Sequence, residues 1–441
     1  MNNLTTKNDL QKVAAILLVV LLIAVFPVQA QELDTILNRL SKEYHFTYKK
    51  MKTGDFFKEK YLLEVEQPVD HKNPEGQKFT QRVFLSHKGF NNPVVFITEG
   101  YSADYAENPY VKSELCSILD ANQIIVEHRY FSKSTPKPLD WSQLTVYNAA
   151  SDHHRINEIL KNIYKGKWLS TGISKGGQTT IYYRYFYPDD VDVSVPYVAP
   201  LNFSIEDKRV YRFLKTVGTD ECRSKVRQYQ LLMFKNKDKF MPVFRKIAKK
   251  KKLTYRMGFD KAYDLLVFEY SFSFFQWGQV DCNDIPMFED SAKVELEHLN
   301  NVAGLDWISD QGIEKLQPFF YQALAEIGFY GYDITPFRQY TTYTENPTFE
   351  FTAPEGVKVK YDPVPMQKVD CFIRHTAKNM IFIYGENDPW SSTSVDLTYN
   401  SNNLKIVKPG GSHRTRINNL PDDQRNMVIS TLKEWLEIGD K

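Results

Sequence analysis

The sequence has little excess charge of either sign. Its 441 residues contain 56 Lys and Arg against 54 Asp and Glu, and the net charge is +2. Residues 1–30 hold two lysines and one aspartate, so a chain without them has a charge near +1. This balance gives no reason to expect nucleic acid or an anionic membrane as a partner. The lysine run at 249–252 is local and is typical of the solvated end of a helix.

Cysteine is scarce, and no Cys/His spacing suggests a zinc site. The four cysteines allow three complete pairings, and they are Cys116, Cys222, Cys282 and Cys371. We favour Cys222–Cys282, because both lie in the inserted segment described below, where a disulfide would order a weak core. Buried free thiols are the alternative. The sequence also shows no internal repeat and no low-complexity tract, and we expect neither a metal nor an organic cofactor.

The N-terminal residues have the pattern of a secretory signal peptide. Lys7 and Lys12 precede an apolar run at 13–26, and small residues follow at 27–30. The run is short for a membrane span. The cleavage site has no cysteine, so we do not expect a lipoprotein. We therefore expect residues 1–30 to be removed and the protein to be secreted or periplasmic, without a stable membrane association. An uncleaved anchor is the alternative.

Short apolar runs alternate with helical patterns along much of the remaining chain. The runs predict buried strands at residues 94–97, 124–126, 168–170, 193–195, 380–384 and 404–407. A helix is expected at about 147–163 and another at about 422–438. Alternating strands and helices predict an α/β fold with a parallel sheet covered on both faces. Residues 61–65 and 82–85 predict an antiparallel pair of strands that precedes this sheet.

The alternation stops after Pro200. Residues 205–340 are mostly helical in pattern, with charged outer positions and aromatic inner ones, before a strand begins again at Met380. We interpret residues 205–345 as a helical cap inserted into an α/β domain, whose two parts are 31–204 and 346–441. Such a cap would restrict which substrates reach the core.

Residues 172–176 read Gly-x-Ser-x-Gly between the predicted strand at 168–170 and a helical pattern. This order is typical of the nucleophile elbow of an α/β-hydrolase, where small residues leave room for a sharp turn that exposes the serine. Ser174 is therefore the candidate nucleophile.

A serine nucleophile needs a base and a group that orients the base. In α/β-hydrolases the acid and then the histidine follow the serine, each after a late strand. Asp388 follows the predicted strand at 380–384, and His413 follows the one at 404–407. Ser174, Asp388 and His413 thus form a candidate triad, with Glu386 as an alternative acid.

Other polar residues near the predicted site are weaker candidates. The oxyanion hole would use the backbone N–H of Lys175 and that of Tyr101, in the loop after the third predicted strand, where Gly100 permits close approach. His128 follows an early strand and is expected to support the site. His153 and His154 are adjacent on a helix and therefore point apart.

Several segments resemble known serine peptidases. Residues 67–74, 79–82 and 127–131 resemble the secreted Pro-Xaa carboxypeptidase and dipeptidyl-peptidase group, family S28. The serine segment at 172–177 and the cap segment at 269–277 are closer to the bacterial tripeptidyl aminopeptidases of family S37. The resemblance spans about residues 61–413. Two residues depart from this resemblance. Ser132 stands where the family commonly has Gly, and Phe275 stands where Trp is common.

The resemblance implies a secreted serine exopeptidase that releases short peptides, often tripeptides and frequently after proline, from a free N-terminus. Such an enzyme must hold an ammonium group in a closed pocket, and a buried carboxylate would supply the partner. Glu269 and Glu326 in the cap are the candidates. Trp390, beside Asp388, is a candidate wall for the residue before the cleaved bond.

Two other classes of function remain open. A carboxylic-ester hydrolase would use the same triad without acidic residues in the cap. A binding protein that keeps the fold would not react at Ser174. The sequence does not determine the length of the released peptide or the oligomeric state.

Overall fold

A computed structural model describes residues 32–286, 291–399 and 402–439. The chain divides into two compact units, residues 1–46 and 47–441. The described part of the first unit is largely helix α2 (Leu33–Tyr44), whose apolar residues recur at helical spacing. The predicted signal peptide at 1–30 lies outside the described residues. No helix in the described ranges combines the length and the apolar character that crossing a membrane requires.

A mixed sheet of nine strands forms the centre of the second unit among the described residues, in the order β1-β2-β3-β5-β4-β6-β7-β8-β9. Its strands are β1 (Phe46–Met51), β2 (Glu59–Pro68), β3 (Lys78–His87), β4 (Val94–Thr98), β5 (Asn122–Val126), β6 (Trp168–Ile173), β7 (Val193–Tyr197), β8 (Ile381–Gly385) and β9 (Leu404–Lys408). Strands β4 to β9 pair in parallel, whereas β2 and β3 pair antiparallel. The predicted strands and their directions are confirmed. Strand β1 was not predicted, because most of its residues are not buried and it lacks an apolar run.

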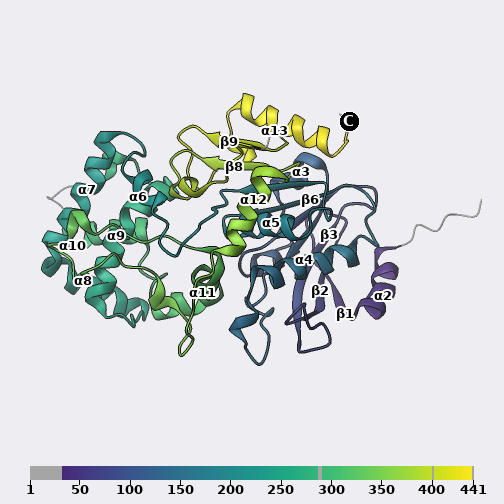
Figure 1. Cartoon of the computed structure of the whole chain (residues 1–441), viewed down its shortest axis with the longest axis horizontal. Coiled ribbons are helices and arrows are strands. Elements are labelled where there is room, and N and C mark those ends of the chain that lie inside the picture. The colour runs from purple at the N-terminus through teal and green to yellow at the C-terminus, as the bar shows by residue number, and fades with distance from the viewer. Residues whose placement is uncertain (1–31, 287–290, 400–401, 440–441) are drawn as a thin grey trace, which may run out of the picture. The chain divides into compact units, whose positions relative to one another are not determined.

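Helices cover both faces of the sheet, as Figure 1 shows. Helices α3 (Glu114–Leu119) and α13 (Asp422–Trp435) share one core with Val95 and Leu169 of the sheet. The neighbouring residues Phe96 and Trp168 point to the other face, where Phe96 contacts Tyr183 of α5 (Lys175–Phe186). Helices α4 (Val146–Leu160) and α12 (Val364–His375) pack against α5. The alternation of side chains along each strand therefore gives two apolar layers.

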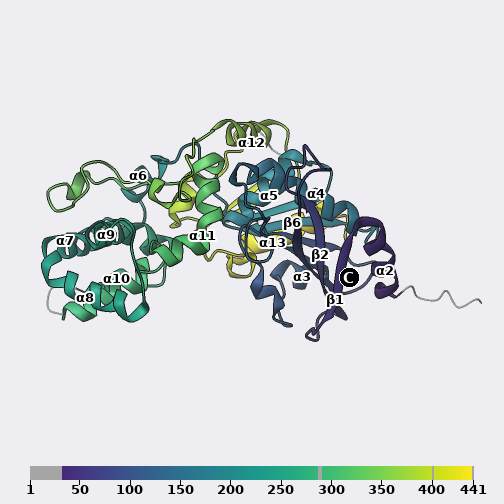
Figure 2. The ribbon, with the colours of Figure 1, turned by 90° about the horizontal axis from the view of Figure 1, so that it is seen from below.

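Helices occupy most of the described chain between β7 and α12, where a cap was predicted. They are α6 (Arg209–Leu214), α7 (Asp220–Lys235), α8 (Lys237–Lys251), α9 (Phe259–Trp277), α10 (Ala292–Ala303) and α11 (Asp310–Gln322). Helix α9 is apolar on nearly all sides and packs against α7, α8 and α10, as Figure 2 shows. The lysine run ends α8 with exposed side chains, as predicted. The exact domain boundaries at 205 and 345 stay a prediction.

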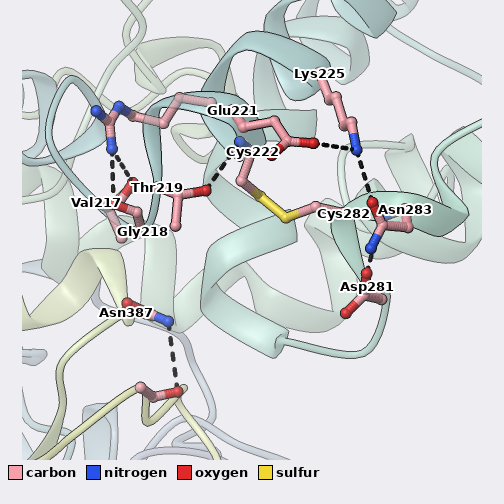
Figure 3. The surroundings of a disulfide bond; sticks show 12 residues. Val217, Gly218, Thr219, Glu221, Cys222, Lys225, Asp281, Cys282, Asn283 and Asn387 are labelled. Carbon is pink, nitrogen blue, oxygen red and sulfur yellow. Dashed lines mark hydrogen bonds and ion pairs between the residues drawn. A yellow bond between two sulfur atoms is a disulfide. The ribbon is translucent and has the colours of Figure 1, made fainter.

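A disulfide joins Cys222 of α7 to Cys282, in the segment that follows α9 (Figure 3). This is the pairing that the sequence favoured. Cys116 is a buried free thiol and Cys371 an exposed one. Lys225 adds polar contacts beside the disulfide, since its Nζ lies 2.8 Å from Glu221 and donates to Asn283. The disulfide therefore links the segment after α9 to helix α7 within the cap.

We expect loss of this disulfide to destabilise the protein. The bridge closes a sequence separation of 60 residues, so the chain-entropy model gives about 4 kcal/mol for the free energy of unfolding. Urea unfolding of the Cys222→Ser variant should show a loss of this order, and a Cys371→Ser control should show little change. Equal midpoints for wild type and Cys222→Ser would contradict the prediction.

Candidate active site

Ser174 is the one residue between the end of β6 and the start of α5. Its backbone has φ 56° and ψ −119°, a conformation that non-glycine residues rarely adopt. The Ser174 N–H donates to the Tyr197 carbonyl at 2.9 Å, and the Ser174 carbonyl accepts from the Gln178 N–H at 2.9 Å. A side chain at Gly172 would overlap the Gly176 backbone, which explains the small residue there. The turn has the form expected of a nucleophile elbow.

His413 and Asp388 lie in hydrogen-bond contact. The His413 Nδ1 is 2.7 Å from Asp388 Oδ2, and the two side chains are only 5% and 0% exposed. An ionised Asp388 can only accept, so the Nδ1–H donates and the lone pair of the imidazole stays on Nε2. The Trp390 N–H donates to the second oxygen of Asp388 at 3.1 Å. This pairing fixes the histidine tautomer that a general base requires.

The cap meets the hydrolase part at His413. The His413 N–H donates to the carbonyl of Gln276 at 2.8 Å. The Trp277 ring lies edge-on to the imidazole, with ring centroids 5.6 Å apart. The C-terminal end of α9 thus helps to hold the histidine, a contact that the sequence did not reveal.

The alternative acid, Glu386, is exposed and its carboxylate accepts from the Gly410 N–H at 2.7 Å. His128 is fully buried, with its Nε2 3.3 Å from the Tyr182 hydroxyl. Burial lowers the pKa of His128 well below its usual value, and the charge of Lys175 adds to this effect. Neither residue contacts the Asp388–His413 pair. No cluster of potential metal ligands occurs among the residues that the structure describes.

The loop after β4 packs directly against the elbow. A side chain at Gly100 would come within 2.7 Å of Lys175 Cβ and within 2.6 Å of the Gly176 nitrogen. Lys175 is the first residue of α5, so its N–H has no acceptor within the helix. The Tyr101 carbonyl accepts from the His128 N–H at 3.2 Å, which holds the loop. The unpredicted β1 makes β4 the fourth strand of the chain rather than the third.

The Lys175 side chain is buried beneath this loop. Its Nζ has no hydrogen-bond partner within the described ranges and lies 5.8 Å from the Tyr101 ring and 5.7 Å from the Phe131 ring. Burial lowers its pKa well below the usual value, although the charge of Glu99 opposes this shift. The Lys175 side chain therefore packs near the Tyr101 ring of this loop.

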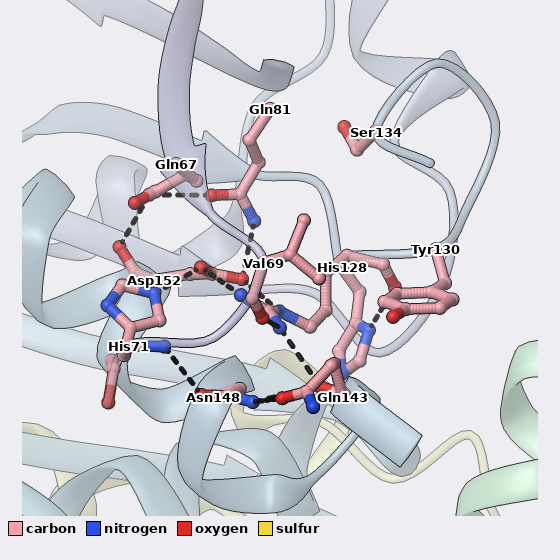
Figure 4. Close-up of polar contacts among 12 residues, drawn as sticks. Gln67, Val69, His71, Gln81, His128, Tyr130, Ser134, Gln143, Asn148 and Asp152 are labelled. Carbon is pink, nitrogen blue, oxygen red and sulfur yellow. Dashed lines mark hydrogen bonds and ion pairs between the residues drawn. The ribbon is translucent and has the colours of Figure 1, made fainter. Parts of the chain in front are cut away.

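The segments that resemble family S28 form a buried scaffold beside this loop (Figure 4). Arg129 contacts both oxygens of Asp152 at 2.7 Å and donates to the Val69 carbonyl at 2.7 Å. His71 Nε2 lies 2.7 Å from the same Asp152. Burial raises the pKa of Asp152, but the charge of Arg129 and the hydrogen bonds more than offset this and leave the pKa low. These motif residues position backbone segments rather than line the pocket.

A cavity of about 1050 Å³ is lined by residues of both the cap and the hydrolase part. Ser174 and His413 line it, and so do Tyr101 and Lys175 of the expected oxyanion hole. Glu269, Trp390 and an aromatic group from the cap line it as well. This volume lies at the upper end of the range that ligand pockets in proteins have.

Glu269 is a buried carboxylate in the wall of this cavity. It is 3% exposed and accepts hydrogen bonds from the hydroxyls of Ser273, Tyr330 and Tyr332. Burial raises its pKa to about 7, and the three hydroxyls oppose this shift. No cation lies within ion-pair distance of it in the described part of the chain. The sequence did not identify Tyr330 and Tyr332, because their distance from Glu269 along the chain conceals the contact.

The structure separates Glu326 from this group. Its carboxylate accepts from the Val146 N–H at 2.7 Å, at the start of α4, and the residue does not line the cavity. A free N–H at a helix N-terminus is a natural partner for a carboxylate. Glu326 therefore caps a helix, and the substrate-binding role expected for it is not supported.

Trp390 packs against aromatic side chains of the cap. It is 7% exposed, and its ring is 5.2 Å from the rings of Phe272 and Tyr330. Of these rings, Trp390 and Tyr330 line the cavity and give it an apolar wall near Glu269.

Comparisons with known proteins identify the family of this chain. The family model described as PS-10 peptidase S37 matches residues 42–440. The prolyl tri/tetrapeptidyl aminopeptidase of Streptomyces mobaraensis is 34% identical over 385 residues, which cover 86% of this chain and 80% of that protein. The prolyl carboxy peptidase like protein 5 of Caenorhabditis elegans is 28% identical over 158 residues, or 32% of this chain and 31% of that protein.

Among solved structures, a proline iminopeptidase from Mycobacterium smegmatis shares 12% identity with a TM-score of 0.43, over 86% of this chain and 100% of that one. The mixed sheet with its elbow after β6 has the arrangement of an α/β-hydrolase. The chain therefore belongs to the PS-10 peptidase S37 family and is a serine-type peptidase on an α/β-hydrolase fold.

Proposed function

We propose that the protein is a secreted exopeptidase that releases short peptides, chiefly tripeptides ending in proline, from a free N-terminus. The observation that carries this proposal is Glu269, a buried carboxylate in the wall of the cavity that holds Ser174. A buried charge needs a partner, and in the described residues the hydrogen bonds to this carboxylate come from three hydroxyls. The α-ammonium of a peptide would supply the missing positive charge.

The proposed chemistry uses Ser174, His413 and Asp388. The Ser174 hydroxyl attacks the carbonyl before the cleaved bond while His413 takes its proton. His413 then protonates the leaving amine, and Asp388 holds the imidazole in the required tautomer. The backbone N–H groups of Lys175 and Tyr101 stabilise the oxyanion. Water attacks the acyl-enzyme in the same manner and frees the N-terminal fragment.

The length of α9 supports a preference for short fragments. Glu269 lies eight residues before Trp277, which contacts His413. At 1.5 Å per residue this is about 12 Å along the helix. Three extended residues span about 10 Å. An ammonium bound at Glu269 would therefore place the third residue near Ser174, and the apolar wall formed by Trp390 suits a proline ring there.

The relative from Streptomyces mobaraensis supports this specificity, since its name states prolyl tri- and tetrapeptide release. Secretion rests on the signal-peptide pattern at residues 1–30. The Cys222–Cys282 disulfide is consistent with an oxidising compartment.

The proposed triad predicts large losses of rate in single variants. Ser174→Ala and Asp388→Asn should each lower kcat for Ala-Ala-Pro-p-nitroanilide by about 10,000-fold or more. The melting temperatures should stay close to that of wild type. A matched Glu386→Gln variant, at the exposed alternative acid, should keep its activity. A fluorophosphonate should label wild type but not Ser174→Ala, and full activity of Ser174→Ala would refute the scheme.

The proposed role of Glu269 predicts a preference for unblocked substrates. Wild type should cleave Ala-Ala-Pro-p-nitroanilide with a higher kcat/KM than its N-acetyl form. Glu269→Gln should lose about ten- to a hundredfold on the free substrate and little on the blocked one, because a charge-assisted hydrogen bond is removed. Glu326→Gln is the matched control and should retain the preference. Equal cleavage of both substrates by wild type would exclude the aminopeptidase; exclusive cleavage of short esters would favour an esterase.

The raised pKa of Glu269 predicts a characteristic pH dependence of this preference. With a pKa of about 7, the carboxyl group is neutral below pH 7 and ionised above it. A peptide ammonium loses its proton above about pH 8. The ratio of kcat/KM for free and acetylated substrates should therefore rise through pH 7 and fall above pH 8, while effects on His413 cancel in the ratio. Glu269→Gln should abolish the rise, and a flat wild-type ratio would count against the assignment.

A further inference from the structure

Arg416 marks a second polar subsite in the cavity, on the hydrolase side. It lines the cavity together with Ser174 and His413 but belongs to the segment after β9 rather than to the cap. The sequence analysis gave no role to this residue, which follows His413 by three positions.

The guanidinium of Arg416 is fixed beside the catalytic histidine. Its Nη1 donates to the His413 carbonyl at 3.1 Å and to the Thr415 carbonyl at 2.7 Å. The guanidinium carbon lies 5.6 Å from the centre of the Tyr197 ring. The carbonyl of Tyr197 accepts the Ser174 N–H. Arg416 is thus tied to neighbours of both Ser174 and His413.

The positive charge of Arg416 has no carboxylate partner within ion-pair distance in the described residues. The nearby Glu114 uses both its oxygens on backbone groups, since it accepts from the Ile417 and Asn418 N–H groups at 3.0 Å. Burial lowers the pKa of Arg416, although arginine stays charged at neutral pH. A half-buried cation without a counter-ion is a site for an anionic ligand group.

The free donors of Arg416 have the geometry of a carboxylate receptor. Its two known hydrogen bonds both use Nη1. The Nε–H and the Nη2–H groups remain, and they form a side-by-side pair that matches the two oxygens of a carboxylate.

The position of Arg416 places this receptor on the leaving-group side. Glu269 lies in α9 on the N-terminal side of Trp277, and Trp277 contacts His413 from the cap. Arg416 contacts the carbonyl of the same His413 from the hydrolase part. A peptide with its ammonium at Glu269 and its cleaved bond at Ser174 would therefore direct its C-terminal residues towards Arg416.

We propose that Arg416 binds the free α-carboxylate of the leaving fragment, so that the preferred substrates are short zwitterionic peptides of four or five residues. This inference rests on the proposed function, because it requires the N-terminal end of the peptide to occupy the cap. The negative and positive ends of the cavity then match the positive and negative ends of one substrate.

The test compares Ala-Ala-Pro-Ala having a free C-terminal carboxylate with the same peptide ending in an amide. Chromatography of released Ala-Ala-Pro gives kcat/KM for both. Wild type should prefer the acid by about ten- to a hundredfold. Arg416→Met should bring this ratio close to one, and Arg416→Lys should give an intermediate ratio because it keeps the charge but not the paired donors. General damage to His413 lowers both rates and cancels in the ratio.

Arg414→Met is the comparison variant, since Arg414 lines the same cavity but is exposed, whereas Arg416 is half-buried; it should retain the acid preference. A wild-type ratio near one, a ratio unchanged in Arg416→Met, or a ratio lost in Arg414→Met instead would each overturn the inference. Ala-Ala-Pro-p-nitroanilide separates this failure from that of the proposed function. If wild type cleaves the anilide but ignores the carboxylate, only the Arg416 subsite is refuted; if it does not cleave the anilide, the tripeptidyl activity itself is refuted.

Discussion

The hydrogen bond between His413 and Asp388 is the interaction on which the rest of the site depends. It joins the turn after β8 to the loop after β9, and the cap adds the Gln276 carbonyl and the Trp277 ring to the same histidine. A histidine held from three directions has little freedom to turn. The position of the cap relative to Ser174 is coupled to this contact, so the depth of the cavity and the orientation of the base are set together.

The cavity contains charges that are costly to bury. Within the described ranges Glu269 accepts hydrogen bonds from hydroxyls and Arg416 donates to carbonyls, and neither has an ion-pair partner there. Stable proteins normally pair such groups. By contrast, Arg129 and Asp152, which are fully buried, form an ion pair with each other in the scaffold beside the loop after β4. We therefore assign Arg129 and Asp152 to the scaffold, and we propose Glu269 and Arg416 as the groups that bind the two ends of a peptide.

The positions of the buried strands were predictable because buried parallel strands leave continuous apolar runs. The elbow was predictable because a turn this tight admits only small neighbours, which leaves the motif around Ser174. Strand β1 was missed since it is largely unburied. The contact of Glu326 was not predictable for a related reason: the pattern shows that Glu326 lies among aromatic residues, but not that its carboxylate accepts from the Val146 N–H.

The sequence by itself determined the candidate functional groups and the segments that carry them: a serine in a strand–turn–helix, a late aspartate and histidine, and a helical insertion rich in aromatic residues. These are local patterns, and the local backbone imposes them. Only the tertiary structure decided which distant groups share the cavity, for example Glu269 with Tyr330 and Tyr332, or Arg416 with His413 and Tyr197. Those contacts depend on how the cap packs on the sheet, and no pattern within a single segment records that packing.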